Sequence, residues 1–279
     1  MNMRRLPTYY LSHGGGPWPW MKDRFGRMFG ALEESLVGVR RELGSAPRAV
    51  LVISGHWEAD GFRVASSPRP PMIYDYYGFP EATYHIRYDA PGSPELAARV
   101  QDLLVAGGVA AGLDPERGFD HGVFSLLKPI YPDADMPIVQ LSMNANYDPA
   151  LHLKVGELLA PLRDEGVVIV GSGASYHDMR GSRDGTGGPA SHAFDAWLTE
   201  TLVEADPQAR RGGLERWAAA PGGRQAHPSE DHLIPLMVAA GAAGGDPGVR
   251  IYHEADFMGS IAISSFRFGS PPVEAPAQP

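Results

Sequence analysis

Cysteine is absent from this chain of 279 residues. Its absence excludes disulfides, thiolate metal sites, iron–sulfur clusters and a cysteine nucleophile. A metal ion would therefore have to be bound by histidine, by carboxylates or by water.

Long apolar runs and an excess of positive charge are also lacking. No segment approaches the roughly 20 apolar residues of a membrane-spanning helix, and residues 1–16 contain no apolar stretch of signal-peptide length. The 24 Lys and Arg are outnumbered by 33 Asp and Glu, which leaves a formal net charge of −9. This charge disfavours nucleic-acid and anionic-membrane partners, because neutralising phosphate supplies most of the affinity for them. We therefore expect a cytoplasmic protein without either partner.

Short apolar segments rich in β-branched residues alternate with segments of helical spacing. The expected strands are residues 8–12, 49–54, 136–141, 167–170, 250–253 and 259–268. The expected helices are residues 25–43, 94–106, 149–162, 192–203 and 230–240. Nearly continuous apolar strands are typical of a parallel sheet buried on both faces.

This alternation predicts an α/β fold with a central, mainly parallel or mixed sheet flanked by helices. We expect one domain over residues 1–269, followed by a disordered Pro- and Ala-rich tail over residues 270–279. Ser93 before Pro94 is a typical helix start. Residues 180–188 are expected to form a loop, which is either a lid or a solvated surface segment.

The placement of the histidines is the most informative feature. His13, His56 and His177 each lie at or just after the end of an expected strand. The carboxyl ends of parallel strands form the ligand crevice of such sheets, so these three side chains are expected to converge there. Imidazoles suit zinc or iron, and two of them with a carboxylate and open positions suit non-haem Fe(II). The alternative is three separate hydrogen-bonded loop histidines.

A fourth histidine lies near an expected helix start. Ser229 is a suitable N-cap, which places Glu230, Asp231 and His232 in the first helical turn. Carboxylates there complement the helix dipole, so both acidic residues have a structural explanation, with metal ligation as the alternative. A cationic His232 would be disfavoured there, whereas a neutral imidazole bound to metal would not.

Two further patterns carry weaker signals. His121 follows Asp120, and such a pair can act in acid–base chemistry, although adjacent side chains often do not touch. The run from His13 to Gly16 is similar to an esterase oxyanion-hole motif. The Gly-x-Ser-x-Gly elbow that this motif requires is missing, because His177 stands at its last position.

Taken in order, eight segments resemble the DOPA-dioxygenase type of extradiol aromatic-ring-opening dioxygenases, in the class III, protocatechuate 4,5-dioxygenase-like superfamily. The segments are residues 11–14, 52–58, 73–80, 88–92, 119–122, 139–142, 171–177 and 227–236. The resemblance covers nearly the whole chain before the tail. It implies a metal-dependent enzyme that cleaves a catechol-type ring with O2, using Fe(II) for activity, while Zn(II) can occupy the purified protein.

The resemblance also implies roles for individual residues. His13, His56 and His232 match metal ligands, although more distant members use a carboxylate as the third ligand, which leaves Glu230 or Asp231 as a substitute. His177 matches a pocket histidine that acts as acid or base or joins a four-histidine zinc site, and His121 matches a histidine near the dioxygen position. An aromatic wall would come from Trp18, Trp57, Tyr74, Tyr76 and Phe79, for each of which core packing is the alternative.

Fold alone does not settle function. A non-catalytic metal-binding member of the same fold and a zinc-dependent hydrolase are therefore alternative functions. The sequence indicates neither the particular catechol nor the oligomeric state.

Overall fold

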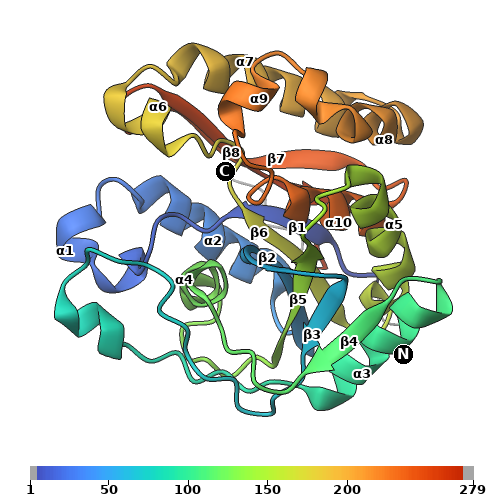
Figure 1. The fold of residues 1–279 in the computed structure, drawn as a ribbon. Helices are drawn as coiled ribbons and strands as arrows, with labels where there is room; N and C mark the ends of the chain where they lie inside the picture. Colours follow the sequence, from blue (N-terminus) through green and yellow to red (C-terminus); the bar gives the residue numbers. More distant parts are fainter. Residues whose placement is uncertain (1–4, 273–279) are drawn as a thin grey trace.

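The computed structural model describes residues 5–272, and an eight-stranded mixed sheet forms its centre (Figure 1). The strands are β1 (Thr8–Ser12), β2 (Ala49–Ala59), β3 (Phe62–Ala65), β4 (Ala111–Asp114), β5 (Ile138–Asn144), β6 (Val167–Gly173), β7 (Gly248–Phe257) and β8 (Ile261–Phe268). Their spatial order is β4-β3-β5-β2-β6-β1-β8-β7. The four middle strands β5, β2, β6 and β1 are parallel, whereas β3 and β8 join them antiparallel. The expected α/β fold is confirmed. Of the two expected forms of the sheet, mainly parallel or mixed, the mixed form is present.

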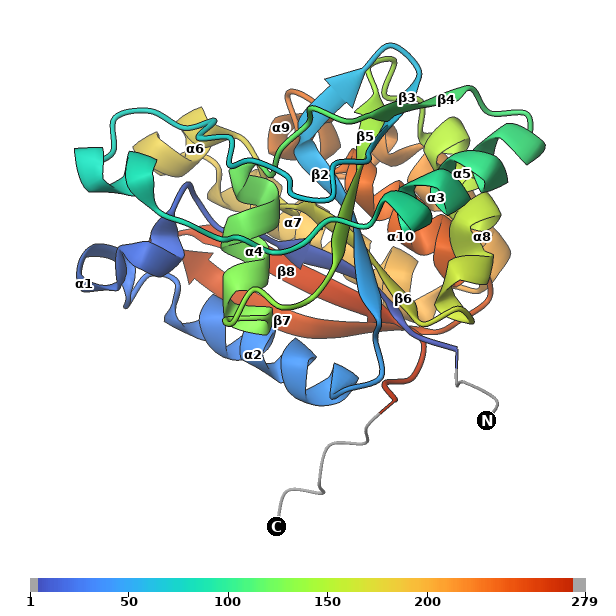
Figure 2. The same cartoon turned by 90° about the horizontal axis from the view of Figure 1, so that it is seen from below.

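Helices cover both faces of this sheet (Figure 2). The α-helices are α1 (Lys22–Phe25), α2 (Gly30–Leu43), α3 (Pro94–Ala106), α4 (His121–Ile130), α5 (Pro149–Leu159), α6 (Met179–Asp184), α7 (Gly188–Thr199), α8 (Pro207–Glu215), α9 (Gly223–Ala226) and α10 (Ile234–Ala243). Short 3-10 turns lie at Trp18–Trp20, Glu81–His85, Ala160–Arg163 and Trp217–Ala219, and a π-helical turn lies at Glu200–Glu204. Helices α3, α5 and α10 pack on one face, and α2 and α4 pack on the other.

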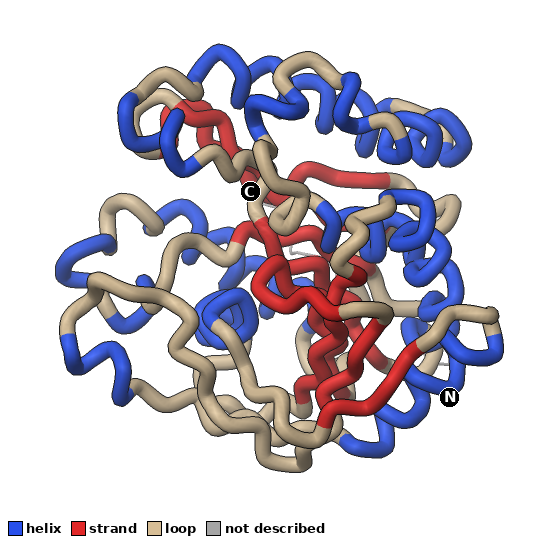
Figure 3. The backbone as a smooth tube through the Cα atoms, viewed as in Figure 1, coloured by secondary structure: helices blue, strands red, loops and turns tan. Residues whose placement is uncertain are grey.

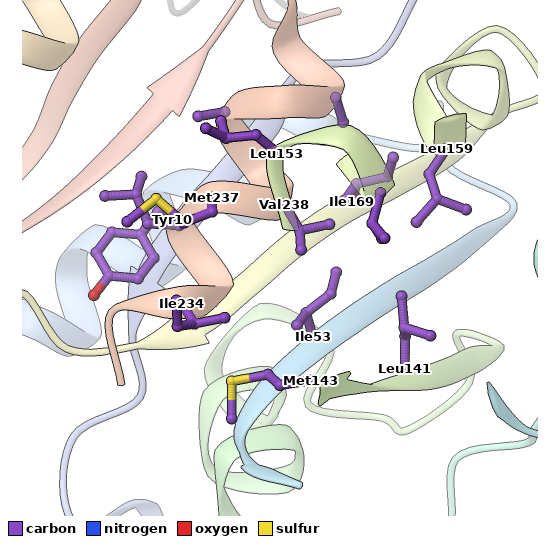
Figure 4. Close-up of a cluster of buried hydrophobic side chains, with 14 of the residues drawn as sticks. Tyr10, Ile53, Leu141, Met143, Leu153, Leu159, Ile169, Ile234, Met237 and Val238 are labelled. Carbon is purple, nitrogen blue, oxygen red and sulfur yellow. The ribbon is translucent and has the colours of Figure 1, made fainter. Parts of the chain in front are cut away.

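Each face of the sheet has its own apolar core. Every residue of β1 and β6 is buried, as expected for strands without a polar face. Figure 4 shows part of the core on the face covered by α3, α5 and α10. In it, Ile53 and Ile169 of the sheet meet Leu153 of α5 and Val238 of α10. Because side chains alternate along a strand, neighbouring residues of β1 enter different cores.

Strand β2 continues beyond its expected end at residue 54. Its register against β5 shifts between Ile53 and Glu58, so the strand bulges there. Bulges next to functional sites re-aim a side chain. His56 lies in this bulged part of β2, within the strand and not after it as expected.

The helix expected over residues 230–240 was placed too early. Helix α10 begins at Ile234, and residues 229–233 form bends and turns in which the backbone N–H groups of Leu233 and Ile234 donate to the Glu230 carbonyl. The cause is Pro235, whose ring nitrogen has no hydrogen to donate to the Asp231 carbonyl and whose ring would clash with it. The predicted N-cap at Ser229 is therefore wrong.

Two other expectations differ from the structure. The segment 180–188, expected as a loop, is mostly helical, because α6 occupies Met179–Asp184 and α7 starts at Gly188. The helix expected over residues 25–43 begins later, because α1 ends at Phe25 and α2 starts only at Gly30. The tail expected at residues 270–279 lies, from residue 273 onwards, outside the described residues.

A long connection, residues 66–93, joins β3 to α3 and crosses the molecule as loop with a single short helical turn (Figure 3). Loops supported by a rigid sheet commonly carry functional groups, and this one contributes Asp75 to the site described below. Across residues 5–272, none of the helices combines the length and apolarity required for membrane crossing.

Candidate metal centre

Three imidazoles converge where the middle strands end. His13 directly follows β1, His56 lies in the bulge of β2, and His232 lies in the turn before α10. The Nε2 atom of His56 lies 3.3 Å from that of His13 and 3.2 Å from that of His232. His13 and His232 are almost completely buried, and the His56 side chain is 20% exposed.

Carboxylates lie beside the Nδ1 atoms of two of these rings. Nδ1 of His232 lies 2.8 Å from a carboxylate oxygen of Asp231, and Nδ1 of His56 lies 3.4 Å from one of Asp75. A carboxylate only accepts hydrogen bonds, so the proton of the neutral His232 ring is assigned to Nδ1, and the nearby Asp75 favours the same tautomer of His56. Both Nε2 atoms then present lone pairs. This arrangement is typical of metal-binding histidines held by outer carboxylates.

With both Nε2 atoms unprotonated, the spacing of the facing nitrogens suits a cation between them. At 3.2 Å, two unprotonated Nε2 atoms cannot hydrogen-bond to each other, and their lone pairs repel. Two nitrogens bound to one tetrahedral ion at about 2.0–2.1 Å are separated by about 3.3–3.4 Å. The observed spacings of 3.2 and 3.3 Å therefore fit a shared first-row metal ion.

Burial keeps these rings neutral, as metal binding requires. Burial, together with the neighbouring histidines, holds the pKa values of His13 and His232 well below their ordinary range. Burial likewise lowers the pKa of His56 to about 3. Burial raises the pKa of Asp75, but the hydrogen bond and charge of His121 outweigh it, so the net shift is downward and Asp75 stays ionised.

Two further histidines border this cluster. The ring of His177 stacks on that of His232, with 3.3 Å between the ring centroids. The ring of His121 lies 3.9 Å from that of His56 between centroids, and its Nδ1 lies 3.0 Å from Asp75. Nitrogen atoms of His13, His56 and His121 lie within 4.8 Å of one another, as do ligand atoms of His177, Asp231 and His232. All five histidines chosen from the sequence are thus brought together.

A family model described as the catalytic LigB subunit of aromatic ring-opening dioxygenase matches residues 9–266. The chain belongs to the LigB family.

Curated relatives of this LigB protein carry closely related names. A 4,5-DOPA dioxygenase extradiol from Beta vulgaris is 41% identical over 228 residues, covering 80% of this chain and 84% of the relative. One of the same name from Escherichia coli K12 is 35% identical, covering 96% of this chain and 97% of the relative. The crystal structure of an uncharacterized protein from Escherichia coli K12 has a TM-score of 0.77 at 31% identity, covering 95% of this chain and all of that one. These matches support ring-opening dioxygenase activity.

The acidic residues of this LigB chain take other positions than those expected. Glu230 forms a 2.6 Å ion pair with Arg224, and Asp231 accepts from the ring of His232. Neither serves in a first helical turn. Asp120 does not orient His121, because its carboxylate accepts from Ser54, Arg117 and Gln140.

The proposed aromatic wall divides into buried and bordering members. Trp18 is 2% exposed, and its indole N–H donates to the His13 carbonyl over 2.8 Å, so it supports the site from within the core. Trp57 is also buried and is covered by the guanidinium of Arg117 at 4.8 Å. The edge-on ring of Tyr76 lies 6.0 Å from that of His121 between centroids.

The remaining members of the wall lie around Tyr76. Phe79 packs edge-on against Tyr76, with 5.3 Å between centroids, and Tyr74 lies 6.2 Å away. The Tyr74 hydroxyl donates to the Ile86 carbonyl. Tyr74 also lines a cavity of about 690 Å³, together with prolines of the long loop.

Asp75 is a site residue that no sequence pattern predicted. This residue lies 46 positions from His121 in the chain and touches it only through the long loop. Nothing in its local spacing signals the contact. The one available indication was its place within the segment 73–80 of the family resemblance.

Proposed function

We propose that this LigB-family protein is a metal-dependent extradiol dioxygenase that cleaves a catechol-type ring with O2. His13, His56 and His232 would hold Fe(II), and Zn(II) would occupy the same nitrogens in protein purified without iron. The observation that carries the proposal is that the Nε2 atoms of His13 and His232 lie 3.3 and 3.2 Å from Nε2 of His56, the spacing of ligands on one ion.

Bound Fe(II) would supply a centre that brings a catechol and O2 together. The surrounding histidines would then act as general acids and bases. Burial lowers the pKa of His177, so a nitrogen of its neutral ring can accept a catechol proton and later return it. Nδ1 of His121 is held by Asp75, which leaves its Nε2 for contact with the reacting atoms.

Anaerobic reconstitution with Fe(II), followed by oxygen uptake over a panel of catechols, tests the proposal. We expect uptake with Fe(II) and none with Zn(II) in the same protein. A fully iron-loaded protein that consumes no oxygen with any catechol would contradict the proposal and favour a non-catalytic metal-binding role. Hydrolysis supported by Zn(II) alone would favour the hydrolase alternative.

The same assay tests the roles of His121 and His177. We expect His121→Ala and His177→Ala to keep iron and to lower kcat by about 10²–10⁴-fold, the usual cost of lost acid–base help. KM should change less, because catechol would be held mainly by the metal. Loss of iron from His177→Ala would instead make His177 a ligand.

A further inference from the structure

One peptide group lies between two of the proposed metal ligands. The carbonyl of Gly173 accepts from the backbone N–H of His13 over 3.2 Å. The N–H of Ala174, in the same peptide unit, donates to the carbonyl of His232 over 3.2 Å. The end of β6 thus connects the backbones that carry His13 and His232, which are far apart in sequence.

The His232 carbonyl receives a second donor from β1. The hydroxyl of Tyr10 donates to it over 2.7 Å, and both groups are buried. Burial raises the pKa of Tyr10 well above its ordinary value, so the hydroxyl keeps its proton and remains a donor. Figure 4 shows the Tyr10 ring beside Met237, with Ile234 at the start of α10 nearby.

Close packing leaves little freedom for the turn that carries His232. A Cβ atom on Gly173 would lie 2.0 Å from the His232 carbonyl oxygen. A Cβ atom on Gly55 would lie 3.1 Å from the Asp231 carbonyl oxygen. His232 lies outside the regular helix α10. The position of its backbone is therefore limited by the close approach of Gly173 and Gly55, not by helical hydrogen bonds.

We propose that Tyr10 and the Gly173–Ala174 peptide are positioning groups that hold the His232 backbone at the correct separation from His13 for metal binding. The inference rests on the proposed metal centre. It adds residues that touch neither metal nor substrate but set metal affinity through the ligand backbone. Outer partners of metal ligands typically contribute about 10- to 100-fold to affinity.

The adjacent residue Tyr9 offers a matched control. Tyr9 and Tyr10 lie on the same strand and are both fully buried, but they enter different cores. The Tyr9 hydroxyl donates to Glu42 over 3.3 Å, away from the histidines. Tyr9→Phe and Tyr10→Phe therefore remove the same atom from the two faces of one strand.

The experiment measures Co(II) and Zn(II) affinity by competition with a chelator, the rate of metal loss, and the visible spectrum of bound Co(II). We expect Tyr10→Phe to weaken binding by about 10- to 100-fold, to speed metal loss and to alter the Co(II) spectrum. Tyr9→Phe should match the wild type in all three. A second variant, Gly173→Ala, should displace the His232 carbonyl and weaken metal binding further.

The outcomes separate this inference from the proposal on which it rests. Wild-type protein that binds neither metal would overturn the metal centre and the inference together. Tight wild-type binding with an unchanged Tyr10→Phe would overturn the inference alone. Equal losses in both tyrosine variants would also overturn it, because general strand packing would then be the cause.

Discussion

At the scale of single residues, Asp75 connects two different tasks. One of its oxygens accepts from the backbone N–H of His121 at 2.9 Å and lies 3.0 Å from Nδ1 of the same residue. Its other oxygen lies 3.4 Å from Nδ1 of His56. A single carboxylate therefore contacts both a proposed metal ligand, His56, and a second histidine of the cluster, His121.

We expect Asp75→Asn to weaken metal binding by about 10- to 100-fold and to reduce turnover even at saturating Fe(II). The amide NH2 can donate to Nδ1 of either ring, which would move that ring's proton to Nε2 and remove the lone pair facing the metal. Chelator competition and oxygen uptake would measure the two effects. Asp89→Asn, on the same loop but exposed and paired with Arg87, is the control and should leave both unchanged.

At the scale of elements, the strands that lie in the middle of the sheet were predictable. Residues 167–170 are apolar without interruption because helices cover both sides of β6, and burial of this kind is visible in sequence. Helix α4 was missed because it is short and contains Pro129, a residue that disfavours a helix interior. Strands β3 and β4 were missed because each has only four residues.

Contacts between distant elements could not be derived from local patterns. The convergence of His13, His56 and His177 was predicted from their places at expected strand ends, although His56 lies within the longer β2. The start of α10 at Ile234 was not predicted. Ser229 is a typical N-cap residue, and this pattern outweighed the helix-breaking effect of Pro235. Asp75 and Tyr10 act through partners 46 and 222 residues away, and no local spacing encodes such contacts.

The start of α3 provides a test at this scale. The Ser93 side chain accepts from the Leu96 N–H, as the sequence predicted. Ser93→Ala should lower the free energy of unfolding by about 1 kcal/mol, whereas Ser93→Asp should retain most of it. Urea denaturation measures this change. Metal affinity should not move, and equal stability of both variants and the wild type would show that the cap contributes nothing.

At the scale of the whole molecule, buried neutral histidines make stability depend on pH. Burial lowers the pKa of His227 from an ordinary 6.5 to about 3, and its ring hydrogen-bonds the Ser175 carbonyl away from the metal nitrogens. Below about pH 6.5 the unfolded chain binds a proton that the folded protein refuses. This histidine therefore reduces stability progressively as the pH falls towards about 3, with no effect at higher pH.

We expect the metal-free protein to lose stability between about pH 6 and about pH 4, and His227→Gln to lose less. The difference in slope should approach 1.4 kcal/mol per pH unit, roughly the value of one proton. Glutamine can still donate to the Ser175 carbonyl. His13, His56 and His232 remain in both proteins, so their contributions to the pH dependence of stability cancel in the comparison. Urea denaturation at several pH values measures the slopes, and identical slopes would refute the assignment.

The position of β1 in the sheet has a consequence for how the protein is made. This strand is the first to be synthesised, yet both of its neighbours, β6 and β8, come from the second half of the chain. Translation proceeds at about 5–20 residues per second. Thr8–Ser12 therefore cannot pair with its neighbouring strand β6 until Val167–Gly173 has left the ribosome. His232 emerges later still, so the three nitrogens cannot meet before it has left the ribosome. Metal binding at the proposed site therefore requires that residue 232 has emerged, and nascent fragments that end before it should leave the ribosome without the site.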